Sequence, residues 1–505
     1  MRKNNVFVWV LMSALIASAA FTSCKDDDDD PDTPDAPEYN WSEDEGLKAC
    51  DNLIFNGNEI GNGDQGFVFK GKQTIAKGVY TLKGWVYVAD GSELTIEPGT
   101  VIKGDKLTKA ALIVERGGKL FAEGTASEPI VFTSAADAGS RRPGDWGGVI
   151  VCGKARNNQA EMQIEGGPRS KHGGDDDADN SGVISYVRIE FAGYPFAADK
   201  EINGLTLGSV GSATKIDHVQ VSYCNDDSFE WFGGAVNCDH LIAYRGWDDE
   251  FDTDNGFRGN VQFCLSVRDP RLADTSRSNG FESDNCADGA SVEPYTTATF
   301  SNVTFIGPMG QDANFMNDDS YINGGSVYPN NGSALGKFQA AMHIRRSSRL
   351  SCFNSVALGW PIGLILDSEK GNTQKMATDA ELTLNNIWFA DMELLAADCN
   401  KATADALYDY ATQTYDESIV SFSHSFFLAQ KGNKQCEAAS LLLTRPESKV
   451  GADYMPAAGS PLLSAADFSS SRLDGFTRVD YIGALSASDT WLDGWTEFDP
   501  QNAAY

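Results

Sequence analysis

Two adjacent segments of 22 residues in the middle of the chain repeat each other. Residues 203–224 read NGLTLGSVGSATKIDHVQVSYC, and residues 225–246 read NDDSFEWFGGAVNCDHLIAYRG. Laid one beneath the other, they place Leu207 over Phe229, and a third copy then brings Phe251 beneath Phe229. Self-similarity at a fixed period of this kind is typical of proteins that stack one structural unit on the next, so that each unit packs mainly against its neighbours.

Short apolar phrases of strand length recur along the chain. They alternate apolar with polar residues and are bounded by Gly, Asn, Asp or Pro, which is typical of β-strands. The phrases are ISYVRIEFAG from Ile184, FSNVTFIG from Phe300, CFNSVALG from Cys352, LNNIWFA from Leu384 and FSHSFFLA from Phe422. Most are not separated by helical stretches, so the pattern predicts an all-β chain folded as a parallel β-helix, or β-solenoid. A β-sandwich or a propeller is the alternative for part of the chain.

Several longer phrases resemble a known family. They are LTIEPGTVIKG (94–104), EGTASEPIVFTS (123–134), GDWGGVIVCGKA (144–155), DNSGVISYVRIEFAG (179–193), NGLTLGSVGS (203–212), EWFGG (230–234) and the closing VDYIGAL and WLDGWTEFDPQN. They are similar to phrases of a family of bacterial surface lipoproteins, for which a pectin-lyase-like right-handed β-helix is expected. The resemblance extends over most of residues 80–502. It implies the fold, and it brings no established activity and no catalytic residues.

The first residues have the three parts of a secretory signal. Arg2 and Lys3 are basic, residues 6–20 are apolar, and small residues precede Cys24. The apolar stretch is shorter than the about 20 residues that span a bilayer. The sequence FTSC resembles the lipobox of bacterial lipoproteins, so residues 1–23 are interpreted as a signal peptide and Cys24 as the lipidated N-terminus. An ordinary secreted protein with a chance cysteine at this point is the alternative.

Residues 24–50 are predicted to be a flexible acidic tether. Asp26–Asp30 is a run of like charges that repel one another, and the prolines after it prevent regular structure. The run also resembles the export signal that sends some lipoproteins of Gram-negative bacteria to the outer face of the outer membrane. It therefore predicts a lipid anchor in the outer membrane and exposure at the cell exterior, with a plain polar spacer as the alternative. The net charge of −32 excludes nucleic acid as a partner, because such a surface repels phosphate.

The other boundaries follow from the repeat. Residues 51–83 are expected to form an N-terminal cap, residues 84–490 the β-helix, and residues 491–505 a C-terminal tail. Residues 391–418 are rich in Ala, with apolar residues at helical spacing, which predicts one helical insertion between two rungs. Residues 308–336 are rich in Gly and Asn and predict a long loop.

Stacking converts the repeat into columns of carboxylates. Neighbouring strands lie about 4.8 Å apart, so Asp226 is expected over Asp248 and Asp227 over Asp249. Like charges at this separation repel unless a cation lies between them, and calcium prefers sites dense in oxygen ligands. Calcium is therefore the predicted cofactor, and solvated turn acids on an acidic protein are the alternative. The predicted metal ligands are Asp226, Asp227, Asp248, Asp249 and Asp254.

Aromatic and further acidic residues are interleaved with these columns. This combination suits a glycan or a metal-bound ligand. The residues predicted to bind such a ligand are Glu230, Trp231, Trp247, Glu282 and Asp284.

Two other polar groups allow more than one interpretation. Residues 172–182, HGGDDDADNSG, resemble a calcium loop without the EF-hand spacing, so cation binding and an ordinary surface loop are both open. His218 and His240 hold the position that Asn302 and Asn386 hold in other rungs. This equivalence favours a polar ladder at a corner of the β-helix over a catalytic pair.

Two classes of function fit these features. The first is a surface-displayed ligand-binding or scaffold protein, binding a glycan or a cation beside an outer-membrane transporter. The second is a polysaccharide lyase or an inverting glycoside hydrolase, whose two carboxyls stand about 6.5–9.5 Å apart. A lyase also needs a base and a cation or arginine to face the uronate, and His343, Arg345 and Arg346 form one basic spot. Pairing of these arginines with local acids is the favoured interpretation of that spot. No motif assigns catalytic residues, so the binding or scaffold interpretation is favoured and enzymatic activity is left open.

Overall fold

A computed structural model describes residues 48–159, 162–164, 169–196, 202–329, 331–399, 407–409, 414–416, 420–445 and 453–505. Cys24, the predicted signal peptide and the acidic run lie outside the described residues.

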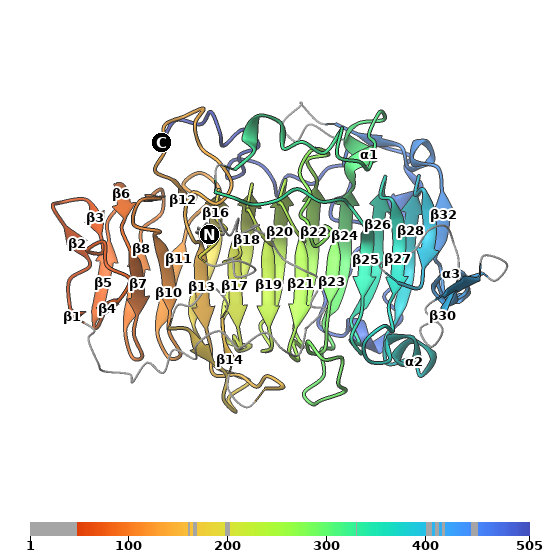
Figure 1. Ribbon diagram of the computed structural model, residues 1–505, viewed down its shortest axis with the longest axis horizontal. Helices are drawn as coiled ribbons and strands as arrows, with labels where there is room; N and C mark the ends of the chain where they lie inside the picture. The colour runs from red at the N-terminus through yellow and green to blue at the C-terminus, as the bar shows by residue number, and fades with distance from the viewer. Residues whose placement is uncertain are drawn as a thin grey trace, which may run out of the picture.

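The chain forms a parallel β-helix whose rungs stack along the long axis of the molecule (Figure 1). Sheet A is 12-stranded and pairs equivalent strands of successive rungs. In order, its strands are β1 (Lys48–Cys50), β4 (Phe67–Phe69), β7 (Trp85–Val88), β10 (Ala111–Val114), β13 (Val149–Cys152), β17 (Leu205–Gly208), β19 (Phe229–Phe232), β21 (Phe251–Asp254), β23 (Phe281–Ser283), β25 (Ala340–Ile344), β27 (Ile362–Leu366) and β29 (Leu394–Ala397). The predicted β-helix is confirmed.

Sheet B runs alongside sheet A and is 16-stranded. Its main path is β2 (Ile54–Phe55), β3 (Glu59–Ile60), β6 (Val79–Leu82), β9 (Val101–Gly104), β12 (Ile130–Ser134), β16 (Gly182–Glu190), β18 (Lys215–Ser222), β20 (Cys238–Tyr244), β22 (Asn260–Val267), β24 (Thr299–Ile306), β26 (Ser351–Leu358), β28 (Leu384–Ala390) and β32 (Lys434–Cys436). A side ladder of β5 (Lys72–Ile75), β8 (Glu93–Ile96) and β11 (Lys119–Glu123) joins it at β16. Parallel pairing therefore starts at residue 48 rather than 84 and ends at residue 436 rather than 490.

Each long strand of sheet B bends at one residue in the left-handed backbone conformation, with φ between 48° and 60°. Asn tolerates this conformation better than most residues because its short side chain forms local hydrogen bonds. The bend residues are Tyr186, His218, His240, Phe263, Asn302, Asn354 and Asn386. The predicted equivalence of the histidines and asparagines at a corner is confirmed.

The repeat predicts the register well in sheet B and less well in sheet A. His218 and His240 lie one rung apart, and the rings of Phe229 and Phe251 stack 5.6 Å apart in the core as expected. Leu207, however, pairs with Trp231 rather than Phe229. The turn from sheet A to sheet B is two residues longer after β17 than after β19, and this shifts the alignment.

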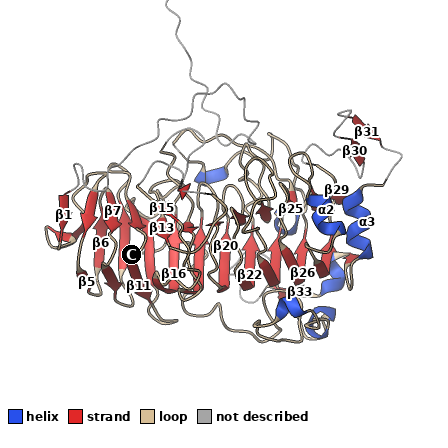
Figure 2. Ribbon diagram, turned by 90° about the horizontal axis from the view of Figure 1, so that it is seen from below, coloured by secondary structure: helices blue, strands red, loops and turns tan. Residues whose placement is uncertain are grey.

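The helical segments differ from the prediction. The helix expected over residues 391–418 is not formed by the described part, which contains β29 and the hairpin β30 (Leu407–Asp409) and β31 (Thr414–Asp416). β29 instead finds a partner in β27, so tertiary pairing overrides local propensity. The phrase FSHSFFLA, expected as a strand, is helix α3 (Phe422–Ala429). It packs at the end of the stack of rungs (Figure 2). There the ring of Phe427 lies 4.5 Å from that of Phe389.

The remaining elements are short. The predicted loop 308–336 contains only α1 (Pro308–Gln311) and η1 (Gly325–Val327) among its described residues. Elsewhere lie α2 (Thr373–Thr378), β14 (Met162–Gln163) with β15 (Lys171–His172), η2 (Ala438–Leu441), β33 (Leu443–Thr444) with β34 (Met455–Pro456), η4 (Pro461–Ser464) and η5 (Ser471–Leu473). No described helix is long and apolar enough to cross a membrane.

Residues 457–505, here called the strap, return along the outer face of sheet B to the first rungs (Figure 1). Side chains of successive rungs donate hydrogen bonds to strap carbonyls: Asn386 to Ala465, Asn354 to Asp467, Asn302 to Tyr481, Gln262 to Thr477, Gln220 to Glu497 and Arg141 to Pro500. Apolar strap residues complete a second core against sheet B; they include Leu462, Ile482, Leu485, Leu492, Trp495 and Phe498. From β16 to β28, both faces of sheet B are therefore largely buried.

Candidate cation-binding site on sheet A

The candidate site begins where the chain turns from sheet B into sheet A. Asp227 and Asp249 precede β19 and β21, and the Asp227 carboxylate accepts a hydrogen bond of 2.9 Å from the backbone N–H of Asp249. The Asn203 side chain accepts from Asp227 N–H at 3.2 Å, and the Asp249 carboxylate accepts from Asn279 N–H. The column predicted from the repeat therefore exists, and one oxygen of each aspartate serves the backbone of the next rung.

Carboxylates converge around this column in two overlapping groups. Oxygens of Asp226, Asp227 and Asp248 all lie within 4.8 Å of one another, and so do oxygens of Asp227, Glu230 and Asp252. Asp227 belongs to both groups, so they form one continuous patch. We call these residues the acidic patch. Of the predicted metal ligands, the patch contains Asp226, Asp227 and Asp248. Asp249 lies beside it, and its backbone N–H donates to the Asp227 carboxylate.

Burial makes this patch electrostatically costly. Burial raises the pKa of Asp227 and Asp248 well above the usual range, and neighbouring aspartates, including Asp249, raise both further. Asp248 is only 7% exposed. Ser276 donates a hydrogen bond of 2.6 Å to its Oδ2, whereas its buried Oδ1 has no hydrogen-bond partner among the described residues. No described basic side chain forms an ion pair with Asp227, Asp248 or Asp252. An unpartnered buried carboxylate oxygen is costly unless a proton or a cation compensates it.

Farther along sheet A, the charges are neutralised by basic residues. Arg345 pairs with both Glu282 and Asp284, the latter at 3.0 Å, and Arg346 pairs with Asp284 at 2.9 Å. Although burial raises the pKa of Glu282, Arg345 and His343 lower it to about 2. Burial lowers the pKa of His343, but hydrogen bonds to Asp367 and Glu282 raise it to about 9. Glu282 and Asp284, predicted as ligand-binding residues, are thus occupied within the protein.

Asp254 lies between the acidic patch and this neutralised region. Burial and the charge of Asp284 raise its pKa to about 7, against the effect of Arg346. It is outside the two groups of converging oxygens, so the structure does not bring it together with Asp226 and Asp248.

The predicted tryptophans are not on the surface. Trp231 and Trp247 are both 0% exposed. Trp231 shares the inward side of β19 with Phe229 and stacks on Phe257 at 5.3 Å, and Trp247 belongs to the second core. Both had been expected to contact a ligand because acids are interleaved with them in the sequence. Alternation along β19 places Trp231 on the opposite face from Glu230, and Trp247 lies in the turn before β21. This part of the prediction is wrong.

The repeat also predicts Glu230 over Asp252, and this pairing is confirmed, although Asp252 was not among the predicted ligands. Sequence reasoning missed one contributor. Ser276 comes from the segment between β22 and β23, which departs from the repeat, so no pattern indicated it.

A family model for a pectate-lyase-like beta helix domain matches residues 68–420. The chain belongs to this family. A solved structure, the Dettilon tailspike protein (gp208), is similar at 11% sequence identity with a TM-score of 0.24, over 64% of this chain and 58% of that chain. A search of curated proteins found no match.

This pectate-lyase-like β-helix carries a second acidic segment, residues 172–182. Two of its aspartates bind to groups of neighbouring segments of the chain. Asp177 forms ion pairs with Arg156 and, at 2.7 Å, with Arg258. Asp179 accepts a hydrogen bond of 3.1 Å from Lys154 N–H. These contacts favour the interpretation as an ordinary surface loop.

Proposed function

We propose that this protein is a lipid-anchored, surface-displayed β-helix that binds calcium at the acidic patch and acts as a ligand-binding or scaffold protein. The observation that carries the proposal is the buried, unpartnered Oδ1 of Asp248, beside Asp226 and Asp227. Calcium takes six to eight oxygen ligands in flexible geometries, which suits carboxylates from two turns. The family's name points to carbohydrates, so a glycan held through the calcium ion is the ligand class that we infer. An outer-membrane transporter is the corresponding partner.

Calcium is expected to raise the unfolding temperature of the wild-type protein. Binding to the folded state alone stabilises it by about 2.7 kcal/mol when free calcium is about 100-fold above Kd. The double variant Asp226→Asn with Asp248→Asn should lose this shift, because amides keep the size of the side chains but remove the charge. Calorimetric titration and thermal unfolding with and without calcium measure both effects.

The matched control removes two exposed charges elsewhere, by Asp137→Asn with Asp319→Asn. This control should keep the calcium-dependent shift in full. Asp249 is left unchanged because its carboxylate is part of the backbone ladder. Calcium binding by the patch variant at wild-type affinity would refute the proposed site.

The effect of calcium should also grow with pH. A carboxyl whose pKa is higher in the folded than in the unfolded state stabilises the fold below the unfolded pKa of about 4, and this contribution is lost as the pH rises through the folded pKa. Because burial and the neighbouring aspartates raise the pKa of Asp227 and Asp248 well above the usual range, calcium-free protein should lose stability as the pH rises above about 4. Calcium should restore most of the loss.

An inverting glycoside hydrolase is the second candidate function. One observation favours it: neighbouring rungs hold Asp254 with a pKa of about 7 and Glu282 with a pKa of about 2, and carboxyls with divergent pKa values suit an acid and a base. Against it, the ion pairs of Glu282 with Arg345 and His343 reduce its availability as a base. Release of oligosaccharides by wild-type protein, lost in Asp254→Asn, would establish the enzyme; we expect glycan binding without cleavage.

The proposed lipid anchor has its own test. Cys24→Ala should abolish lipid attachment, so that the variant appears in the soluble fraction while the wild-type protein stays with the membrane. Mass spectrometry of the N-terminal peptide and protease accessibility on whole cells measure attachment and exposure. The variant Cys50→Ala serves as the control and should remain lipidated. Equal release of wild-type and Cys24→Ala protein, with no lipid on either, would contradict the anchor.

A further inference from the structure

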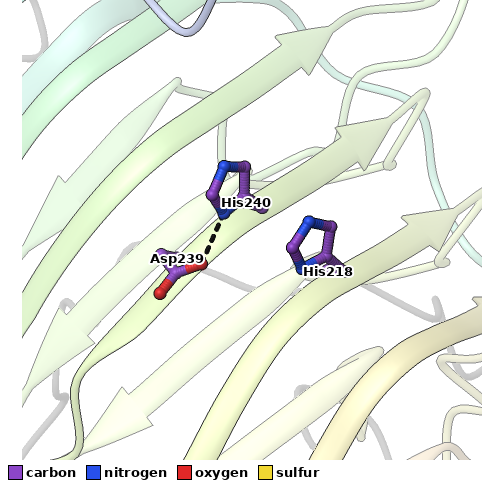
Figure 3. Close-up of side chains that lie close together, drawn as sticks. All are labelled: His218, Asp239 and His240. Atoms are coloured by element: carbon purple, nitrogen blue, oxygen red, sulfur yellow. Dashed lines mark hydrogen bonds and ion pairs between the residues drawn. The ribbon is translucent and has the colours of Figure 1, made fainter. Parts of the chain in front are cut away.

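Two histidines occupy neighbouring rungs at the bend of sheet B, on the side of the molecule that the strap covers. The rings of His218 and His240 stack with centroids 4.4 Å apart and an angle of 8° between their planes (Figure 3). One nitrogen of each ring and a carboxylate oxygen of Asp239 lie within 4.8 Å of one another. The side chains of His218, His240 and Asp239 are 16%, 23% and 50% exposed, so solvent reaches the group.

Carboxylates orient both rings. His218 Nδ1 lies 2.8 Å from an oxygen of Asp217, and His240 Nδ1 lies 2.5 Å from an oxygen of Asp239. A carboxylate acceptor at Nδ1 retains the proton there and leaves the lone pair on Nε2. A carboxylate behind an imidazole is the usual support of a metal-binding histidine.

The histidines differ from the asparagines of the same column. Asn302, Asn354 and Asn386 each donate a hydrogen bond to a carbonyl of the strap. Neither His218 nor His240 forms such a bond to the described part of the strap, which instead places Trp491 and Trp495 edge-on to the rings. Hydrogen bonding to strap carbonyls therefore accounts for the asparagines, whereas the histidines contact the strap through their rings and stack on Tyr186 and Phe263 of the adjoining rungs.

We propose that His218 and His240, with Asp239, form a binding site for zinc. Imidazole nitrogens suit zinc, whereas calcium requires oxygen ligands. Nitrogens bound to zinc at about 2.0–2.1 Å lie at most about 4.2 Å apart, so the two rings turn out of their parallel stack when their Nε2 lone pairs converge on the ion. Asp239 either stays behind His240 or turns to the ion, and water completes the coordination. The site is separate from the acidic patch and does not depend on calcium binding.

The column itself supplies the test variant. His218→Asn with His240→Asn places at each bend the residue that Asn302 and Asn386 already provide, so the backbone conformation is retained while the metal ligands are lost. After chelation and exchange into buffer with calcium, calorimetric titration with zinc should give one ion per wild-type chain and at least about tenfold weaker binding for the variant. The patch variant Asp226→Asn with Asp248→Asn should bind zinc like the wild type.

X-ray absorption on the zinc-loaded wild-type protein gives a second measurement that requires no variant. Scattering from two imidazoles per zinc is expected. Zinc surrounded by oxygen alone, or undiminished zinc affinity in the histidine variant, would overturn the proposed site. Loss of zinc binding in the patch variant only would assign the ion to the acidic patch and would equally overturn it.

Discussion

Deletion of the strap, residues 457–505, is expected to prevent accumulation of soluble, folded protein. The strap covers the outer face of sheet B, where Tyr244, Val267 and Leu358 would otherwise meet water. Each large apolar side chain transferred to water costs about 1.5–3 kcal/mol. Many such side chains are buried on each side of this second core, and the sum exceeds the about 5–15 kcal/mol of net stability that a folded protein has. Expression, solubility and circular dichroism measure the result.

A single substitution tests the same contact with a smaller expected loss of stability. Trp495 is 0% exposed and packs edge-on against Tyr186 at 5.9 Å, so Trp495→Ala should lower the free energy of unfolding by about 3–5 kcal/mol. Arg478→Ala, at an exposed strap position, should change it by less than about 0.5 kcal/mol. A truncated protein that remained soluble and unfolded cooperatively at the wild-type temperature would show that the strap is dispensable.

The contacts of the strap explain why the sequence did not predict its place. Its closing phrases resembled the family, but its partners, such as Gln262 for Thr477 and Gln220 for Glu497, are more than 200 residues away. These contacts use backbone carbonyls, which every residue has, so no pattern of residue types marks them. The rungs differ, because a strand that pairs with its equivalent must repeat its apolar positions, and the repeat is then visible in the sequence.

The candidate site was predictable to the same extent as the rungs. Asp227 and Asp249 share a position in the repeat, so their stacking was foreseen and is confirmed. Pairing of Arg345 with local acids was expected, but Glu282 was not identified as its partner, because Arg345 reaches the neighbouring rung only after the long insertion between β23 and β25. Burial of Trp231 was missed because the alternation of β19 was read for its residue types and not for which side faces the core.

Replacement of Arg268 is expected to have the largest effect of any single substitution near the acidic patch. Arg268 and Glu250 form an ion pair of 2.7 Å, and both side chains are 0% exposed. The guanidinium also donates to the backbone carbonyls of Asp248 at 2.5 Å and Trp247 at 3.0 Å. It therefore holds the turn that positions Asp248. Burial raises the pKa of Glu250, and the charge of Arg268 lowers it, so removal of the arginine leaves a buried carboxyl without its counterion.

Arg268→Met should lower the free energy of unfolding by about 3–5 kcal/mol, because breaking a buried pair leaves the other group uncompensated. The double variant Arg268→Met with Glu250→Met removes that penalty but still leaves the backbone carbonyl of Asp248 without a donor, at about 1–3 kcal/mol. The carbonyl of Trp247 keeps the hydroxyl of Ser278 as a donor at 2.7 Å. It should therefore recover only part of the loss. Chemical denaturation of both single variants and the double variant completes the cycle. Calcium affinity should fall in every variant that lacks Arg268, since the turn carrying Asp248 is then unsupported, and full stability of Arg268→Met with unchanged calcium binding would contradict this role.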